Sequence, residues 1–131
     1  PTSAQWGYEN RTTAIRIPGG DFASKRIEHR VAGGDTNPYL VMTAVLGSAL
    51  LGIEKKLTPI KPVMNNAYSN SAEKLARNWE DAINYFENDK EIKQIFSNEL
   101  IENLVRTKRQ ELNKFKKIES KKHWKYYVAA V

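Results

Sequence analysis

Residues 12–21 read Thr-Thr-Ala-Ile-Arg-Ile-Pro-Gly-Gly-Asp, a run rich in β-branched residues followed by a turn signal. β-Branched side chains favour extended backbone because they pack well on a pleated surface. In the Pro-Gly-Gly-Asp that follows, proline fixes φ and glycine permits backbone angles that other residues avoid. The stretch therefore predicts a β-strand over residues 12–17 that ends in a turn.

A second strand is predicted over residues 25–31, Lys-Arg-Ile-Glu-His-Arg-Val, because polar and apolar side chains alternate along it. One face carries Arg26, Glu28 and Arg30. The other face carries Ile27, His29 and Val31. We expect this second face to pack inward, with the histidine packed or hydrogen-bonded.

A helix is predicted over residues 38–54. Asn37 offers a capping side chain, and Pro38 suits the first helical turn because its missing N–H would be unpaired there anyway. The side chains of this helix are apolar almost all round, so we expect it to be buried on most sides.

The rest of the chain reads as a loop followed by helices. The expected order is a loop over 57–74, a helix capped by Asn78, a short helix over 89–96, a long helix over 98–119 and a final helix over 121–131. The predicted fold class is α+β. Two N-terminal strands from a larger catalytic sheet, within residues 1–34, precede a mostly helical region over residues 35–131.

The composition excludes several classes of protein. The 131 residues include 21 Lys and Arg against 15 Asp and Glu, for a net charge of +6, and no cysteine. The length suits one domain. The lack of cysteine excludes a disulfide scaffold, a Cys-based zinc site and thiol catalysis, and it favours a reducing compartment, the cytoplasm. The longest apolar run, residues 39–53, is too short and too rich in small residues to span a bilayer, so no membrane partner is expected.

Arginines dominate the polar side chains of the two predicted strands. They are Arg11, Arg16, Arg26 and Arg30, with Glu28 among them. Guanidinium groups hold a neighbouring carboxylate ionised, as a divalent cation requires, and they bind phosphate or carboxylate as planar forks. This combination indicates phosphoryl transfer, although no general base is evident. The alternative is a solvated charged face with little effect on stability.

Three ordered segments carry a resemblance to a known family. They are Trp6-Gly7-Tyr8-Glu9-Asn10-Arg11-Thr12-Thr13-Ala14-Ile15-Arg16-Ile17-Pro18, Arg26-Ile27-Glu28-His29-Arg30 and Asp35-Thr36-Asn37-Pro38-Tyr39-Leu40. They resemble the C-terminal part of the glutamine synthetase catalytic domain, and the likeness continues more loosely to the end of the chain. Trp6-Gly7-Tyr8 and the Gly-Gly turns look most like the γ-glutamylpolyamine synthetase branch.

The resemblance implies an ATP-dependent carbon–nitrogen ligase. Such an enzyme phosphorylates the γ-carboxylate of L-glutamate and then joins it to ammonia or to an amine such as a polyamine, with Mg²⁺ or Mn²⁺ as metal. By the same match, Arg11 contacts the transferring phosphoryl group, Arg16 and Arg26 contact ATP phosphates, Glu28 binds metal, and Arg30 engages the reacting carboxyl region of glutamate. Arg11 and Arg30 are thus the implied catalytic residues. Arg11 and Arg16 have opposite parity along a strand, so they share a site only if the chain bends or one of them lies outside the strand.

The resemblance also implies a cytoplasmic homo-oligomer in which rings of subunits form active sites between them. The chain opens on Pro1, and the rest of the site would lie upstream. We therefore expect these 131 residues to be one part of a longer enzyme, and to be inactive alone.

Two other functional classes are weighed against the ligase. The tail from Lys114 to Tyr127 interleaves lysines with aromatic residues, as nucleic-acid-binding modules do. At helical spacing, however, these aromatics favour docking onto the protein or a neighbouring subunit, so we expect no nucleic-acid partner. The other alternative is a noncatalytic interaction domain. Retention of all four arginines together with Glu28 argues against it.

Overall fold

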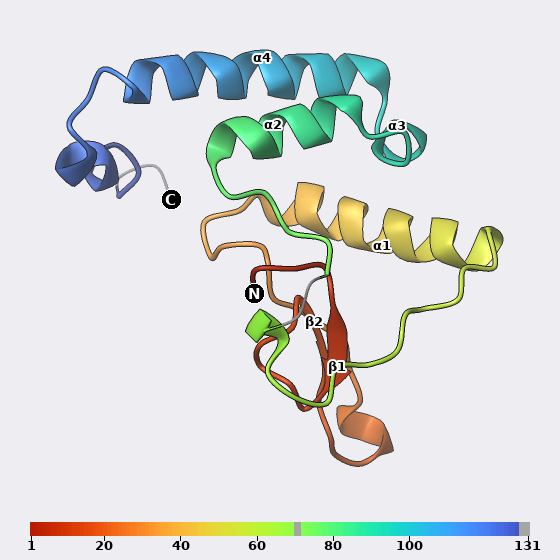
Figure 1. Cartoon of the computed structure of the whole chain (residues 1–131). Helices are drawn as coiled ribbons and strands as arrows, with labels where there is room; N and C mark the ends of the chain where they lie inside the picture. Colours follow the sequence, from red (N-terminus) through yellow and green to blue (C-terminus); the bar gives the residue numbers. More distant parts are fainter. Residues whose placement is uncertain (70–71, 129–131) are drawn as a thin grey trace. The chain divides into compact units, whose positions relative to one another are not determined.

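A computed structural model describes residues 1–69 and 72–128 (Figure 1). The chain divides into two compact units, residues 1–75 and 76–131. The first unit contains a small sheet and one long helix, and the second contains helices. The α+β class, with strands before helices, is thereby confirmed.

The sheet has three short strands in the order β1 (Trp6–Tyr8), β2 (Ile15–Ile17) and β3 (Glu28–His29). Figure 1 labels the first two. β1 and β2 are parallel and pair Gly7 with Arg16, whereas β2 and β3 are antiparallel and pair Arg16 with Glu28. β1 was not predicted. Its three residues carry no alternation, and they become a strand only through pairing with β2 and with the later loop.

Side chains close the tight connection between β1 and β2. The Asn10 Oδ1 atom accepts hydrogen bonds from the Thr12 N–H at 3.0 Å and from the Thr12 hydroxyl at 2.6 Å. The buried Thr13 hydroxyl lies 2.8 Å from the carbonyl oxygens of both Asn10 and Ile15. Such side-chain bonds compete with strand pairing. The strand predicted over residues 12–17 therefore starts too early, and the observed strand β2 begins at Ile15.

β3 is shorter than predicted and does not bury an apolar face. Only Glu28 and His29 pair with β2, rather than the whole of residues 25–31. Ile27 is 69% exposed and Val31 is 45% exposed. His29 is also exposed. The expectation that this face packs inward is wrong for this chain, because no described element covers it.

The loop after the long helix packs along β1. The Val63 N–H donates to the Trp6 carbonyl at 2.9 Å, and the Asn10 Nδ2 donates to the carbonyls of Val63 and Asn65 at 2.9 and 2.8 Å. A short 3₁₀ turn, η2 (Ala67–Ser69), interrupts this loop. Ala14, Val63 and Ala67 are buried and form the small apolar core of the unit. Residues 70 and 71 of the predicted loop lie outside the described residues.

The helix α1 (Pro38–Glu54) has the bounds that the sequence predicts. The Asn37 side chain accepts hydrogen bonds from the Tyr39 and Leu40 N–H groups, as an N-cap should. The predicted burial is wrong, since no residue of α1 is buried in this chain. Its more exposed large apolar side chains are Tyr39, Met42, Leu46, Leu50 and Ile53, each more than half exposed.

The second unit is built on α2 (Trp79–Asn88), α3 (Ile92–Ile95) and α4 (Asn98–Phe115), followed by the 3₁₀ segment η3 (Ser120–Tyr126). Asn78 and Ser97 cap α2 and α4 as predicted. The apolar core contains Ile83, Phe96, Ile101, Val105 and Phe115. α4 ends four residues before the predicted position, because the Ile118 N–H bonds to Phe115 in a tighter turn. The predicted final helix is a 3₁₀ segment, and its residues 129–131 lie outside the described residues.

Candidate active site

Glu28 lies among three guanidinium groups. Arg16 Nη1 is 2.9 Å from Glu28 Oε2, Arg26 Nη2 is 3.0 Å from Glu28 Oε1, and Arg30 Nη1 is 3.9 Å from Glu28 Oε2. The alternation of residues 25–31 predicts the neighbourhood of Arg26, Glu28 and Arg30. Arg16 joins them through the β2–β3 register, which places it directly opposite Glu28. The sheet thus brings together residues that are twelve positions apart in sequence.

The surroundings of Glu28 keep its carboxylate ionised. Hydrogen bonding from Arg16 lowers the pKa of Glu28, and Arg26 adds to this effect. The side chain is 27% exposed, so water or a ligand can still reach it. An ionised, accessible carboxylate is the form that binds a divalent cation.

Arg16 also binds a second carboxylate, that of Glu9. Arg16 Nη2 lies 2.8 Å from Glu9 Oε2, and the Arg16 side chain is only 11% exposed. Two carboxylates therefore face three guanidinium groups at this site. Sequence reasoning missed Glu9 as a site residue, because its approach to Arg16 depends on the parallel pairing of β1 with β2.

Arg11 lies outside the strands, in the connection between β1 and β2. Its side chain is exposed, and its carbonyl oxygen accepts a hydrogen bond from Arg30 Nη2 at 3.0 Å. The chain bends here, which is the condition under which Arg11 and Arg16 can belong to one site. Arg11 is thus linked to Glu28 through Arg30.

Two buried donors of the site lack an acceptor. Within residues 1–69 and 72–128, the Nε atoms of Arg16 and Arg30 are buried and make no hydrogen bond. A buried unpaired donor destabilises a protein by about 1–3 kcal/mol, and more when it is charged. The ion pairs with Glu28 and Glu9 use the Nη atoms of these arginines and leave the two Nε atoms without an acceptor among the described residues.

The fit to a metal is partial. Among the described residues, no three His, Asp or Glu side chains lie together as a metal site. Glu28 could supply one oxygen ligand, and a cation bound there would need further oxygen ligands from elsewhere.

No helix in the described part of the chain is long and apolar enough to cross a membrane.

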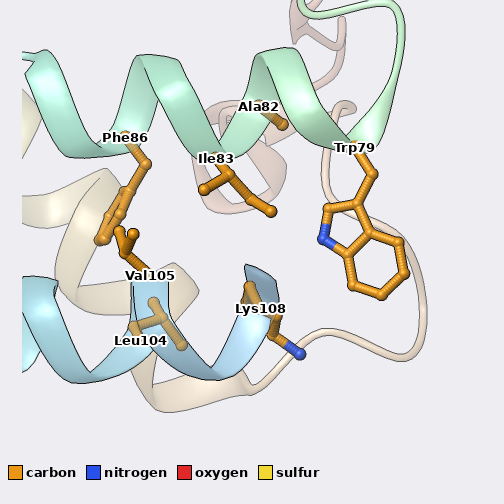
Figure 2. A pocket seen from close by; sticks show the side chains of 7 residues that line it. All are labelled: Trp79, Ala82, Ile83, Phe86, Leu104, Val105 and Lys108. Atoms are coloured by element: carbon orange, nitrogen blue, oxygen red, sulfur yellow. The ribbon is translucent and has the colours of Figure 1, made fainter. Parts of the chain in front are cut away.

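An apolar groove lies in the other unit, between α2 and α4 (Figure 2). It is lined by Trp79, Ala82, Ile83, Phe86, Leu104, Val105 and Lys108. Figure 2 shows Trp79 and Lys108 toward one end of this groove and Phe86 toward the other. Lys108 Nζ lies 2.8 Å from Glu111 Oε2, so the only charged group of the lining already has a partner. The groove therefore offers packing surface but no reactive group.

Two rings of the basic tail, those of Tyr126 and Tyr127, contact Phe115, whereas Trp124 is 58% exposed. Tyr127 stacks on Phe115 with ring centroids 5.2 Å apart, and Tyr126 meets the same ring edge-on at 5.7 Å. Lys114 Nζ lies 5.4 Å from the Tyr126 ring centroid. Rings engaged in this way are less available to stack on bases.

The sequence is similar to known proteins over most of its length. The sequence model of the glutamine synthetase catalytic domain matches residues 1–127. The chain is 40% identical over 109 residues to glutamate–isopropylamine ligase from a Pseudomonas species, covering 81% of this chain and 24% of that protein. It is 43% identical over 90 residues to γ-glutamylputrescine synthetase PuuA of Escherichia coli K12, covering 68% of this chain and 19% of that protein.

Other relatives extend the likeness. The glutamine synthetase of Sulfolobus acidocaldarius is 36% identical over 123 residues, covering 85% of this chain and 26% of that protein. A solved structure of GmaS, in its apo form without ligand, is similar with a TM-score of 0.77 and 28% identity, over 98% of this chain and 30% of that one. The chain thus spans about a quarter of the length of the curated relatives it matches.

Proposed function

Because the chain belongs to the glutamine synthetase family, we propose that its arginine-rich site is part of the active site of an ATP-dependent ligase acting on L-glutamate. The reaction would activate the γ-carboxylate as γ-glutamyl phosphate and then join the γ-carbonyl to a nitrogen nucleophile. These 131 residues would supply one portion of that site, and we expect them to be inactive without the rest of the enzyme.

The observation that carries this proposal is the placement of Glu28 among Arg16, Arg26 and Arg30. In phosphoryl transfer the protein mainly positions the reactants and stabilises negative charge on oxygen. An ionised carboxylate for a cation, surrounded by guanidinium groups for phosphate and carboxylate oxygens, suits both tasks.

The roles proposed for single residues follow the family match. Glu28 would be one of the residues that hold Mg²⁺ or Mn²⁺, and the metal would supply positive charge for the ATP phosphates. Arg16 and Arg26 would bind ATP phosphates. Of these two, Arg26 is the more accessible, with its side chain 55% exposed.

Arg11 and Arg30 would act on the reacting groups. Arg30 would hold the γ-carboxyl region of glutamate, and Arg11 would stabilise the phosphoryl group in transfer. The hydrogen bond from Arg30 to the Arg11 carbonyl supports a shared position for the two residues. The exposed Arg11 side chain is free of the sheet, so it can reach a ligand that approaches the site from outside.

The acceptor we propose is an amine rather than ammonia. Two relatives with 40% and 43% identity are named for amine acceptors, isopropylamine and putrescine, whereas the glutamine synthetase of S. acidocaldarius is 36% identical. The intact enzyme would be a cytoplasmic homo-oligomer that forms rings, as implied for the family. It would need neither a membrane nor a nucleic acid.

The test is product analysis with the full-length protein that contains these residues. It is given L-glutamate, Mg-ATP and, in separate reactions, ammonium, isopropylamine, putrescine or no acceptor, and the γ-glutamyl products are identified by mass spectrometry. We expect a γ-glutamylamide with an amine and little glutamine with ammonium. Glutamine as the main product would overturn the amine assignment, and no γ-glutamyl product with any acceptor would overturn the ligase assignment.

A further inference from the structure

Glu9 has an unusual backbone conformation at the end of β1. Its φ angle is +51°, in the left-handed region that glutamate seldom occupies. The Glu9 N–H donates to the Ile17 carbonyl at 3.0 Å, so the strained residue is held by the pairing of β1 with β2. A non-glycine residue kept in this region is strained, and such strain often marks a functional position.

The Glu9 side chain joins two parts of the site. Its Oε1 atom accepts a hydrogen bond from the Gly19 N–H, in the turn after β2, and its Oε2 atom accepts one from Arg16 Nη2 at 2.8 Å. A side chain at position 19 would place its Cβ only 3.2 Å from Glu9 Oε1, so glycine leaves room for this contact. Both bonds lower the pKa of Glu9, with the Gly19 contribution the larger, and keep the carboxylate ionised.

Arg16 is consequently bound at both ends of its guanidinium fork. Nη1 donates to Glu28 and Nη2 donates to Glu9, at 2.9 and 2.8 Å. Because the guanidinium is planar and rigid, fixing Nη2 also fixes the direction of Nη1 and of Nε. Within the described residues, the ion pairs of Arg26 and Arg30 are with Glu28.

We infer that Glu9 is a positioning residue that holds the Arg16 guanidinium against Glu28 and so orients the carboxylate proposed to bind metal. Glu9 acts through Arg16 and does not itself touch substrate. The inference rests on the proposed function only for the role of Glu28 as a metal ligand. The contacts between Glu9 and Arg16 do not depend on that role.

The test uses the full-length protein with Glu9→Gln, Arg16→Lys and the double variant. The matched control is Glu102→Gln, which removes an exposed carboxylate 3.4 Å from Arg106 in the other unit. Residues that orient metal ligands affect metal affinity about 10–100-fold. We therefore expect Glu9→Gln to raise the half-saturating Mg²⁺ concentration by about tenfold. Glu102→Gln should leave it unchanged.

The double variant tests whether Glu9 acts through Arg16. Residues that share one interaction have non-additive effects. The half-saturating Mg²⁺ concentration of the double variant should therefore differ from that of Arg16→Lys by less than about twofold. Additive effects, or a Glu9→Gln protein with the parent's Mg²⁺ dependence, would overturn the inference. A purely structural role would instead lower the melting temperature without moving the Mg²⁺ dependence, which also overturns it.

A second measurement separates this inference from the proposed function. Phenylglyoxal modifies accessible guanidinium groups, and mass spectrometry reports the modification of Arg16 whether or not the protein turns over. We expect Arg16 to be protected in the parent and in Glu102→Gln, and to be modified in Glu9→Gln. Equal protection in all three proteins would overturn the inference. A parent without ligase activity in which Arg16 still responds to Glu9→Gln would overturn the proposed function alone.

Discussion

The two units of the chain are held together by different kinds of interaction. In residues 1–75, the site rests on ion pairs, on side chains that bond the backbone of a tight connection, and on a small apolar core. In residues 76–131, amphipathic helices bury apolar side chains against one another and have ordinary caps. The first unit is thus arranged around its charged groups, and the second around its apolar core.

α1 belongs with the first unit and sharpens this contrast. It is a long apolar helix without a single buried residue in this chain, whereas α4, of similar length, buries Ile101, Val105 and Phe115. The chain spans about a quarter of the length of its curated relatives. The apolar surface of α1, together with Ile27 and Val31, is apolar surface of the first unit that the described residues leave exposed.

The largest effect expected in the first unit is on metal-dependent turnover. In the full-length protein, Glu28→Gln should lower glutamate-dependent ADP release by more than about 100-fold, because a neutral amide is a poor ligand for a divalent cation. The control is Glu87→Gln, which removes a glutamate bound to an arginine in the second unit. Turnover of Glu28→Gln within a few-fold of the parent would contradict the metal-ligand assignment.

The largest effect expected in the second unit is on stability. Ile101 is 4% exposed, and Ile101→Ala should lower the free energy of unfolding by about 2–4 kcal/mol through lost burial and a cavity. Its neighbour on the same helix, Leu100, is 37% exposed and should lose much less when replaced by alanine. Urea unfolding of the parent and of both variants measures the difference. Equal losses would show that α4 does not bury the face assigned to it.

A smaller loss of stability is expected at the start of α2. Asn78 Oδ1 accepts a hydrogen bond from the Asp81 N–H at 2.8 Å, and Asn78 Nδ2 donates to the Asp81 carboxylate at 2.8 Å. Asn78→Ala should lower the free energy of unfolding by about 1 kcal/mol. Asn78→Ser preserves a capping acceptor without placing a second carboxylate beside Asp81, and it serves as the matched variant. If Asn78→Ala has no effect in urea unfolding, the cap does not stabilise α2.

The smallest expected effect is a pH dependence in the second unit. Arg109 binds Glu87 through both η nitrogens, and this hydrogen bonding lowers the pKa of Glu87. A lowered pKa in the folded state means that the stabilisation is complete above the ordinary glutamate pKa, about 4.3, and is lost as the pH falls through the lower folded value. Glu87→Gln should remove this part of the acid dependence, as measured by urea unfolding between neutral and acidic pH. If the free energy of unfolding depends on pH in the same way in parent and variant, the ion pair does not contribute to stability.

The sequence predicted the local elements better than the pairings between them. The bounds of α1 follow from Asn37 and Pro38, and the start of α2 follows from Asn78, because capping is a local interaction. β1 could not be predicted, since three residues become a strand only through contacts with residues 15–17 and 63. The early end of α4 has a similar cause, because Phe115 joins an aromatic cluster formed by the later tail.

In the candidate site, too, local sequence patterns predicted some contacts, while others depended on how the strands pair. Alternation along residues 25–31 indicates that Arg26, Glu28 and Arg30 lie together, and their ion pairs agree with it. The pairing of Arg16 with Glu28 required the β2–β3 register, and the pairing of Glu9 with Arg16 required β1. Side chains that meet across strands depend on the strand register, and strands of two or three residues without a buried apolar face specify that register only weakly.

The measurement that tests the central claim most directly is ADP release by the full-length protein with Mg-ATP and an amine, with and without L-glutamate. If the arginines and a metal-binding carboxylate act on glutamate, ADP release should require L-glutamate. The Glu28→Gln variant should then abolish this release. ADP release that is indifferent to glutamate, or none from a folded protein, would contradict the assignment of this site to a glutamate ligase.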